Sequence, residues 1–582
     1  MWWLAVTRKP QKIWRERPCD EAVARSLAMQ AGVTPLMGVL LAQRGIDTPE
    51  AVRSFLRPSF EQLPSPLLMK DMEQAVAVVV RAVREQLPVV VYGDYDVDGT
   101  TGIAVLVLFL REIGLECHGL QPRRFEHGYG LHADLLPEPA GGAGLLITVD
   151  CGISDAVEVA RARERGWTVI VTDHHQPPAA LPEADAVLNP LQPGCDFPFK
   201  YLAGVGVAFY LVMGVRAALR EAGFWPAGKE EPNLKNLLDL VAVGSICDMV
   251  PMVGANRVLS VAGLSVLSDR QRPGLRQLLR LAGVNGRQVA ADDVGYRIGP
   301  RLNAPGRLAS AALALELLLT NDDTRAAELA VSVDGMNRER QQLVEEQFRQ
   351  SAVAAAEIGE ARKTLVLHGK DWHGGVLGIV ASRLVDDFCR PTILLRSEGG
   401  LLKGSGRSVD GFDLHGALLR CEDLLEAYGG HTSAAGLTLR PENLAAFKER
   451  FEEVAVRELT EEMQRPVLWV DYRLSGEELG DESFLRDQQL LAPFGIGNPE
   501  PVFAPPEDIR LEQAKVVGGN HLRFSWRASG VTWSGIGFGL GHCLDKIRAR
   551  PARLAFTVRR NCFRGREQWQ LNAVDIDVNT TT

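Results

Sequence analysis

The chain has 582 residues, too many for a single hydrophobic core, so we expect about three or four domains of roughly 100–200 residues each. Hydrophobic residues make up 46% and charged residues 24% of the chain, which is ordinary for a globular protein and excludes a disordered or fibrous one. The formal net charge of −9 does not indicate a nucleic-acid-binding protein, but it excludes none, because a carboxylate-rich site can coexist with basic patches elsewhere.

Cysteine usage and apolar runs indicate the compartment. The nine cysteines are scattered singly with no Cys-x-x-Cys pair, which argues against structural zinc and disulfides and fits a reducing cytoplasm. The N-terminus lacks the apolar run and small-residue cleavage site of a signal peptide. The longest apolar run, residues 102–110, is far shorter than the roughly 20 residues of a membrane span. We therefore expect a soluble cytoplasmic protein that contacts no membrane.

The first 190 residues predict short helices followed by an α/β domain. Residues 20–60 have the pattern of short helices, one of them starting at Asp47-Thr48-Pro49-Glu50 with a capping residue and a first-turn proline. Beyond residue 70, apolar runs alternate with helical stretches, which predicts a doubly wound parallel sheet. The runs cover residues 87–92, 145–149 and 167–172, and the helical stretches cover residues 101–113 and 154–165.

The remaining chain predicts helices, a second α/β domain and a β domain. Residues 233–246 and 309–319 are predicted buried helices, and the breaker-poor, charged residues 323–358 predict a long connecting helix. A coiled coil is the alternative, although the apolar spacing is not a sustained heptad. Strands and glycine-rich turns return at residues 364–440, and short strands after Pro466 predict a small barrel or sandwich. The predicted domains are 1–60 (helical), 61–322 (main α/β), 323–360 (connecting helix), 361–460 (smaller α/β) and 461–582 (β).

Each of the three apolar runs of the main α/β domain ends in acidic or imidazole side chains. In a parallel sheet the carboxyl ends of the strands share one edge, and ligands bind there. A further aspartate follows the apolar helix 233–246. The residues concerned are Asp94, Asp96 and Asp98 after the first run, Asp150 after the second, Asp173, His174 and His175 after the third, and Asp248 after the helix.

Carboxylates clustered in this way would repel one another unless cations lay among them. An oxygen-rich site with one or two imidazoles suits manganese or magnesium better than zinc. Two such ions about 3.5–4 Å apart activate a water and stabilise the leaving oxygen of a phosphoester. The sequence therefore predicts a metal-dependent phosphoesterase.

These aspartates have two other interpretations. Asp-x-Asp-x-Asp-Gly also opens an EF-hand loop, but the twelfth position counted from Asp94 is Val105, where that loop needs glutamate, and a strand precedes the motif. A single aspartate at a strand end is usually a helix cap. Three such ends in succession make capping alone improbable, whereas for Asp248 by itself a capping or surface role is an equal alternative.

The order of these motifs resembles that of the DHH phosphoesterase superfamily: Asp-x-Asp-x-Asp-Gly, a strand-end aspartate, Asp173-His174-His175 and a later aspartate. Further segments resemble the RecJ family of bacterial single-strand-specific 5′→3′ exonucleases within that superfamily. These segments are residues 299–307, 373–379, 404–408, 429–431 and 434–436. The resemblance extends from about residue 25 to the C-terminus, without a departure at a catalytic position.

The resemblance implies a set of site residues. Asp150 would bridge two manganese or magnesium ions, His175 would lie beside the scissile phosphate, and Asp173 would orient the imidazoles. Which of Asp94 and His175 touches metal directly stays open. The full set of implied metal ligands is Asp94, Asp96, Asp98, Asp150, His174 and Asp248.

The activity implied is hydrolysis of single-stranded DNA from its 5′ end to 5′-mononucleotides by a two-metal mechanism, in DNA recombination and repair. A single-strand-binding protein and a helicase are implied as partners, and we expect a monomer. A passage too narrow for duplex between the two α/β domains would account for strand specificity.

Two glycine-rich segments have the composition of phosphate-binding loops. In Gly404-Ser405-Gly406-Arg407 and Gly429-Gly430-His431, glycines let backbone N–H groups approach an anion, and arginine offers a bidentate fork. Ordinary tight turns are the alternative for either segment alone. By resemblance Arg123, Ser405 and Arg407 would hold the 5′-phosphate and His431 would contact the released nucleotide. The other DNA-binding candidates are Gly429, Gly430, Arg301 and Asn303.

The clearest basic patch lies near the C-terminus. Residues 546–566 contain eight lysines and arginines and no acid, with aromatic residues interleaved. This composition in a small β domain suits single-strand binding by an OB-fold. A solvated β surface whose aromatics belong to the core is the alternative. The tentative strand-binding residues are Arg559, Arg560, Phe563 and Arg564.

Two competing functions follow from the same motifs. The first is another DHH phosphodiesterase, of the oligoribonuclease or cyclic-dinucleotide type, but such enzymes lack the β domain predicted after residue 466. The second is a non-catalytic single-strand-binding scaffold with decayed motifs, but here every expected ligand is present.

Overall fold

The computed structural model describes residues 11–226, 228, 230–563 and 566–578. The chain forms two compact units, each built from separate stretches of sequence. Unit 1 comprises residues up to 45, 339–488 and 501–582, and unit 2 comprises residues 46–338 and 489–500. Among the described residues, no helix combines the length and the apolar character that crossing a membrane requires.

Unit 2 is built on a five-stranded, fully parallel sheet with strand order β3-β2-β4-β5-β6. Alternate residues of its central strands pack in opposite layers: Val89 and Val91 join one core cluster, and Val90 and Tyr92 the other. Both faces are therefore covered, and the predicted doubly wound parallel sheet is confirmed. The strands are β2 Val89–Gly93, β3 Cys117–Leu120, β4 Gly144–Val149, β5 Trp167–Thr172 and β6 Ala186–Leu188.

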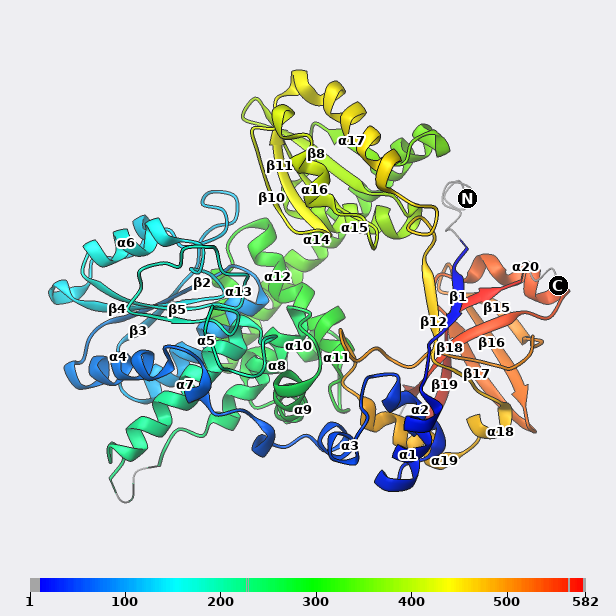
Figure 1. The fold of residues 1–582 in the computed structure, drawn as a ribbon, viewed down its shortest axis with the longest axis horizontal. Coiled ribbons are helices and arrows are strands. Elements are labelled where there is room, and N and C mark those ends of the chain that lie inside the picture. The colour runs from blue at the N-terminus through cyan, green and yellow to red at the C-terminus, as the bar shows by residue number, and fades with distance from the viewer. Residues whose placement is uncertain (1–10, 227, 229, 564–565, 579–582) are drawn as a thin grey trace. The chain divides into compact units, whose positions relative to one another are not determined.

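Helices lie on both faces of this sheet (Figure 1). Helices α4 (Met72–Glu85), α5 (Val97–Glu112) and α7 (Gly204–Glu221) pack in the layer of Val89, and α6 (Ala156–Glu164) packs in the layer of Val90. The other helices of unit 2 are α3 Pro49–Leu56, α8 Leu238–Cys247, α9 Gly254–Ser268, α10 Pro273–Leu281, α11 Ala291–Asp293, α12 Gly299–Leu308 and α13 Ala312–Leu319.

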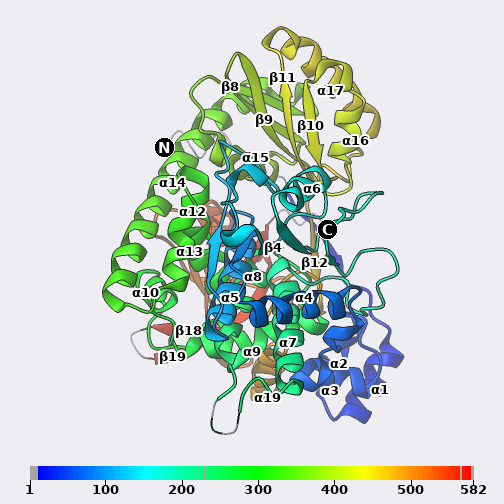
Figure 2. The same cartoon turned by 90° about the vertical axis from the view of Figure 1, so that its left-hand side faces the viewer.

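Helix α14 (Asp323–Ile358) is the predicted long connecting helix, with 36 residues and no break (Figure 2). Its first part belongs to unit 2 and its remainder to unit 1. Alanine, glutamate, arginine and glutamine dominate its sequence, and these residues have high helix propensity.

The smaller α/β part of unit 1 is a five-stranded mixed sheet with order β10-β11-β9-β8-β7. Only β7 and β8 pair in parallel. Its strands are β7 Leu365–Gly369, β8 Thr392–Glu398, β9 Leu401–Arg407, β10 Ala427–Gly430 and β11 Ala434–Leu439, and its helices are α15 Leu377–Phe388, α16 Leu414–Leu419 and α17 Leu444–Glu458.

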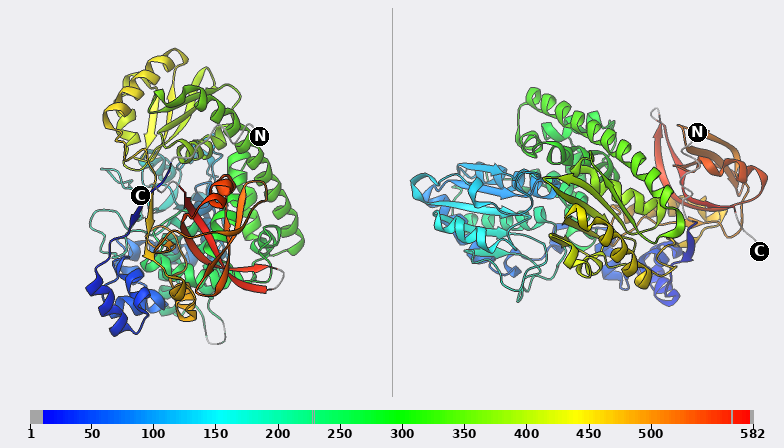
Figure 3. Two further views of the ribbon diagram at one scale, coloured as in Figure 1. Left: turned by 90° about the vertical axis from the view of Figure 1, so that its right-hand side faces the viewer. Right: turned by 90° about the horizontal axis from the view of Figure 1, so that it is seen from above.

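The C-terminal β part is drawn in orange and red in Figure 3. It has the strand order of an OB-fold, β18-β19-β17-β16-β15, in which β17 and β19 pair in parallel and α20 lies between β17 and β18 in the sequence. Two short strands extend this sheet and the N-terminal strand pairs with β12. The elements are β1 Ile13–Glu16, α1 Glu21–Ala31, α2 Pro35–Ala42, β12 Val467–Val470, β13 Tyr472–Arg473, α18 Gly476–Leu479, α19 Glu482–Asp487, β14 Phe503–Ala504, β15 Glu512–Val517, β16 His521–Ala528, β17 Val531–Gly537, α20 Leu544–Ala549, β18 Arg553–Phe563 and β19 Arg566–Asp577.

The structure differs from the expectations at the glycine-rich segments. Residues 404–407 and 429–430 are not loops or tight turns but parts of β9 and β10. Both strands pair with β11, so Gly436 stands opposite Ser405 on one side and Gly429 on the other. Local composition favoured turns, whereas the pairing partners that make these residues strands come from elsewhere in the sequence.

Candidate metal centre

The carboxyl ends of three neighbouring strands position the acidic cluster. β2 runs into Asp94 and Asp96, β4 into Asp150, and β5 into the Asp173–His175 segment. The strand order is that of a flavodoxin-like sheet, and its direction of winding switches between β2 and β4, where such sheets bind ligands.

His174 lies at the middle of this cluster. Its Nε2 is 3.0 Å from Asp150 Oδ1 and 3.7 Å from both Asp98 Oδ2 and Asp248 Oδ2. The four side chains come from β4, β5, α5 and the end of α8, so only the tertiary fold brings them together.

Three groups of side chains have ligand atoms close enough for a common cation. They are Asp94–Asp96–Asp150, Asp98–His174–Asp248 and Asp150–His174–His175, and within each group the atoms lie within 4.8 Å of one another. Asp150 and His174 each belong to two groups. This sharing suits two neighbouring cations with Asp150 between them.

Two of the aspartates also fix the backbone around the site. Asp96 caps α5 by accepting a hydrogen bond from Gly99 N (3.1 Å). Both oxygens of Asp98 accept from the first N–H groups of α7, from Gly204 at 2.6 Å and Val205 at 2.9 Å. Asp96 and Asp98 therefore each cap a helix and also belong to the acidic cluster.

The electrostatics of the cluster require positive charge. Burial, followed by the neighbouring carboxylates, raises the pKa of Asp94 to about 8, that of Asp98 to about 7 and that of Asp248 to about 9. The pKa of Asp150 is raised well above its usual value for the same reasons. Asp94 Oδ1 is buried without a hydrogen-bond partner among the described residues. Hard divalent cations would satisfy both the charge and this oxygen, so the donor set fits them.

The two histidines have different environments. Burial, and then the neighbouring His175, lower the pKa of His174 to about 4, which keeps this imidazole neutral and able to donate a lone pair. Burial opposes protonation of His175 as well, but the hydrogen bond with Asp173 (Nδ1–Oδ1, 2.8 Å) and the negative charges of the neighbouring aspartates together outweigh burial and raise the pKa of His175.

Asp173 holds this part of the site in place. It is fully buried, and its carboxylate accepts from the backbone N–H of His174 (2.7 Å), His175 (3.1 Å) and Ile153 (3.0 Å). Burial alone would raise the pKa of Asp173, but its hydrogen bonds with His175 lower it. The charged carboxylate therefore orients the imidazole of His175.

Sequence reasoning missed Tyr129. Its hydroxyl donates to the carbonyl oxygen of Asp150 (3.1 Å) and lies 3.2 Å from His175 Nδ1. The flanking Gly128 and Gly130 have positive φ, and the carbonyl of Gly130 accepts from Tyr92. Paired glycines around an aromatic residue were the only local signal.

It also missed two arginines beside the acids. A cavity of about 310 Å³ adjoins Asp94 and Asp96, and its lining includes Arg124 and Arg307. The guanidinium of Arg124 lies 5.3 Å from the ring centre of Tyr95. The cavity also contains Asn303, one of the predicted DNA-binding residues.

The other predicted DNA contacts of unit 2 are engaged within the protein. Arg123 is exposed and pairs with Glu126 (2.9 Å). Arg301 donates to Asp334 on α14 (2.8 Å).

The predicted phosphate-binding residues of unit 1 share the edge formed by β9, β10 and β11. Arg407 donates to Ser405 Oγ (3.0 Å), and its guanidinium covers Gly378, where a Cβ atom would lie 2.7 Å from it. Gly429 and Gly430 end β10, and the N–H of His431 donates to Ala434 O (2.8 Å).

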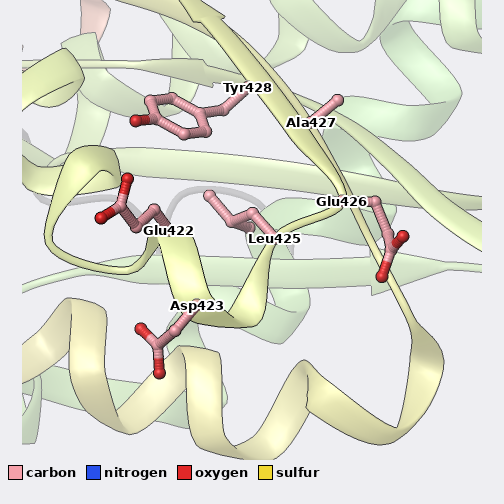
Figure 4. Close-up of a pocket in the computed structure, with 6 residues that line it drawn as sticks. All are labelled: Glu422, Asp423, Leu425, Glu426, Ala427 and Tyr428. Carbon is pink, nitrogen blue, oxygen red and sulfur yellow. The ribbon is translucent and has the colours of Figure 1, made fainter.

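A larger pocket of about 550 Å³ in unit 1 does not suit DNA (Figure 4). Its lining contains Glu422, Asp423 and Glu426 and no basic residue. An acidic lining repels phosphate, so this pocket contributes nothing to a nucleic-acid site.

The tentative strand-binding residues lie on β18. Arg559 is half-buried, and Arg560 is exposed with its guanidinium 5.1 Å from the ring centre of Trp569. Arg564 and the side chain of Phe563 lie outside the described residues. Phe556 is fully buried in the barrel core, as the alternative interpretation of the aromatics expected.

Comparisons with known proteins agree with this architecture. Three family models match: the N-terminal domain of the DHH family at residues 88–245, the DHHA1 domain at residues 353–457 and the RecJ OB domain at residues 470–575. Crystalline RecJ from Thermus thermophilus in complex with Mn²⁺ superimposes with a TM-score of 0.80 and 33% identity, over 97% of this chain and 79% of that one.

Two relatives are named single-stranded-DNA-specific exonuclease RecJ. The protein from Bacillus subtilis is 37% identical over 92% of this chain, which spans 66% of its length. The protein from Dickeya dadantii is 39% identical over 96% of this chain and 97% of its own length. With 39% identity over nearly the whole of this chain and of the Dickeya dadantii protein, and with matches to the DHH, DHHA1 and RecJ OB models along it, the chain belongs to the RecJ family.

Proposed function

We propose that this protein is a divalent-metal-dependent exonuclease that hydrolyses single-stranded DNA from the 5′ end to 5′-mononucleotides. The observation that carries the proposal is the cluster of five aspartates and His174. The pKa is raised at four of these aspartates, Asp94, Asp98, Asp150 and Asp248, and carboxylates in that state call for cations. The RecJ relatives are named for this substrate, and the Thermus thermophilus structure holds Mn²⁺.

The residues of the cluster have different roles. Two divalent cations, manganese or magnesium, would be held by Asp94, Asp96, Asp98, Asp150, His174 and Asp248, and when bound they supply Lewis acidity for in-line hydrolysis of a phosphodiester. Asp150 takes the shared position. His175, fixed by Asp173, presents its Nε2 to the scissile phosphate and donates a proton or hydrogen bond there.

Selection of the 5′ end is assigned to basic and glycine-rich residues. Arg123, Ser405 and Arg407 hold the terminal phosphate, since the arginine and hydroxyl on β9 offer charge-assisted donors. His431, next to Gly429 and Gly430, contacts the nucleotide that departs. The ion pair of Arg301 with Asp334 supports a positioning role for that arginine, while Asn303 faces the cavity beside the acids.

The OB part binds single-stranded DNA. On β16, Leu522, Phe524 and Trp526 point into the barrel, so Arg523 and Arg527 lie on its exposed face. Phe538, 66% exposed, follows β17 and contacts the ring of His521 (5.2 Å). Exposed cations next to an exposed aromatic ring suit phosphate attraction and base stacking, and this is the face that OB-folds use. We assign strand binding to this face together with Arg559 and Arg560 of β18.

The remaining assignments rest on the family. The domains are residues 61–322 for catalysis, 361–460 for end binding and 461–582 for strand binding, joined by 323–360 and preceded by 1–60. A single-strand-binding protein and a helicase are the partners, in cytoplasmic DNA recombination and repair, and the protein acts as a monomer.

The competing functions are less well supported. An oligoribonuclease or cyclic-dinucleotide phosphodiesterase would not need the OB part, and a non-catalytic scaffold would not need a complete set of ligands.

A nuclease assay on 5′-labelled single strands with Mn²⁺ tests the proposal. We expect labelled mononucleotides from the wild type, little cleavage of duplex, and loss of at least about 1000-fold in rate for Asp150→Ala, because that change removes the shared ligand. Glu422→Ala, which alters the acidic pocket of unit 1, is the control. Wild-type protein that leaves ends intact would refute the proposal, and internal fragments as first products would refute end digestion.

A further inference from the structure

The segment 489–500 is an insertion from the C-terminal half of the chain into the catalytic unit. Residues 339–488 and 501–582 belong to unit 1, but these twelve residues belong to unit 2. Its central part, Leu490-Leu491-Ala492-Pro493-Phe494-Gly495-Ile496-Gly497-Asn498, contains no titratable group. Neither the sequence motifs nor the proposed chemistry assigns the segment a role.

The segment ends in a tight turn that holds its own shape. Gly495 and Asn498 exchange two backbone hydrogen bonds, of 2.9 and 3.1 Å. The side chain of Asn498 is fully buried, and its Nδ2 donates to the carbonyl oxygens of Leu491 (2.7 Å) and Pro493 (2.9 Å). Gly497 has φ +75°, a conformation that favours glycine. These hydrogen bonds hold the turn in one conformation.

The turn is docked on the start of α9 and the loop before it. Met252 N donates to Ile496 O at 2.7 Å. The guanidinium of Arg257, only 2% exposed, donates to the carbonyl oxygens of Leu490 (2.8 Å) and Leu491 (2.9 Å). Because a buried guanidinium is costly without partners, these bonds tie the segment firmly to the catalytic unit.

The loop that receives the turn begins at Asp248. Asp248 caps the C-terminus of α8, where its N–H donates to Gly244 O (2.9 Å). Met249 then has φ +60°, which a non-glycine residue adopts only when its surroundings hold it there. Met252, which ends this loop, is bound by the turn. The backbone that carries Asp248 is thus fixed by α8 on one side and by the turn on the other.

We propose that the turn Gly495–Asn498 positions the carboxylate of Asp248 and thereby sets the affinity of the cation held by Asp98, His174 and Asp248. The inference rests on the proposed function, because it concerns the same metal centre. The cation group Asp94–Asp96–Asp150 is carried by the residues that follow β2 and β4, and this loop forms neither. Loosening the turn therefore affects one cation more than the other.

The test is Mn²⁺ binding to the full chain without DNA, measured by titration calorimetry and by the EPR signal of free Mn²⁺. Asn498→Ala removes both side-chain hydrogen bonds of the turn. We expect one of two Mn²⁺ sites to weaken by about 10-fold or more, the usual effect of losing support behind a ligand, and the other to change by less than about 2-fold. Gln489→Ala, which changes an exposed side chain of the same segment, should leave both affinities unchanged.

Two Mn²⁺ affinities equal to those of the wild type, in an Asn498→Ala protein that unfolds cooperatively, would overturn the inference. Equal weakening of both sites would also overturn it. Should Asn498→Ala fail to fold, Gly497→Ala decides instead, because the φ of +75° at this position is strained for any residue with a Cβ atom and the substitution therefore loosens the same turn. A smaller weakening of one site is expected there, and no change refutes the proposal. Wild-type protein that binds no Mn²⁺ would instead refute the proposed function.

Discussion

At the scale of single residues, Nδ1 of His175 has two oxygen atoms within hydrogen-bonding distance. Its Nδ1 lies 2.8 Å from Asp173 Oδ1 and 3.2 Å from the hydroxyl of Tyr129. Since the hydroxyl proton of Tyr129 goes to the carbonyl of Asp150, the hydroxyl accepts from Nδ1–H. Both contacts favour the proton on Nδ1 and leave Nε2 to act on substrate.

Replacing Tyr129 by phenylalanine tests this arrangement. The ring is kept and only the hydroxyl is lost, so His175 keeps its bond to Asp173 but loses a second restraint. One hydrogen bond of about 1 kcal/mol corresponds to a decrease in kcat of roughly 5- to 10-fold, with little change in KM. Steady-state kinetics on single-stranded DNA measures both. Tyr296→Phe, at a residue 81% exposed, is the matched control, and an unaltered kcat for Tyr129→Phe would contradict the role.

The raised carboxyl pKa values predict how metal and pH act on stability. Unfolded aspartates ionise near pH 4, whereas Asp98, Asp94 and Asp248 have pKa values of about 7, 8 and 9 in the folded, metal-free protein. Between these limits the folded state holds more protons than the unfolded state, so stability falls as pH rises. We expect the Tm in chelator to decrease by several degrees from pH 6 to 9.

Saturating Mn²⁺ should remove most of this decrease, because the cations replace the protons among the carboxylates. Thermal unfolding followed by circular dichroism, with chelator or Mn²⁺ in parallel, provides the comparison. A Tm in chelator that rises between pH 7 and 9 would contradict the assigned pKa directions.

At the scale of elements, the first turn of α7 seals the metal cluster. Its N–H groups bind both oxygens of Asp98, and the absence of a side chain at Gly204 lets the helix approach. A Cβ atom on Gly204 would lie 2.7 Å from Asp150 Cβ and 3.0 Å from Asp98 Oδ2. A helix without a side-chain cap of its own is thus capped by a residue of α5.

We therefore expect Gly204→Ala to disturb the metal cluster through the residues that α7 contacts. The added methyl must displace Asp150 or Asp98, and such overpacking costs about 1–3 kcal/mol of unfolding free energy. We expect Mn²⁺ affinity to fall by more than 10-fold, the range seen when the support of a ligand is lost. Urea unfolding and Mn²⁺ titration measure the two effects. Gly206→Ala, two residues further along α7, is the comparison, and equal Mn²⁺ affinities of the two variants would refute the role of Gly204.

At the scale of the whole molecule, binding and chemistry are assigned to different parts of the chain. The metal cluster belongs to unit 2, and the exposed face of β16 and β17 belongs to unit 1. Substitutions on that face should weaken the binding of long strands and leave the chemistry of the metal cluster unchanged.

The double variant Phe538→Ala/Arg523→Ala distinguishes strand binding from the hydrolysis step. Loss of one stacked base and one phosphate contact, worth about 1–3 kcal/mol, should raise KM for long single-stranded DNA roughly 10-fold or more. The kcat at saturation, and hydrolysis of oligonucleotides of a few residues, should stay as in the wild type. Arg560→Ala, on β18, shows whether the second candidate patch contributes. Equal losses on short and long substrates would contradict the assignment.

Much of this protein can be read from its sequence. Apolar runs and breakers predicted the parallel sheet, and the bounds of α14 agree with its residues 323–358. Five of the six residues expected around a metal follow strand ends, and they meet because chain direction in a parallel sheet sends every strand end to the same edge. The sixth, Asp248, follows helix α8 and joins them only through the packing of that helix. Their roles as ligands remain predictions. These features depend on local patterns, which sequence records directly.

Only the tertiary structure revealed Tyr129 beside His175, Arg124 and Arg307 beside the acids, and the turn Gly495–Asn498 beneath the Asp248 loop. It also turned two glycine-rich stretches into paired strands. Each of these depends on contacts between residues far apart in the chain. Such contacts are fixed by packing and hydrogen bonding in the folded state, and no local pattern of residues encodes them.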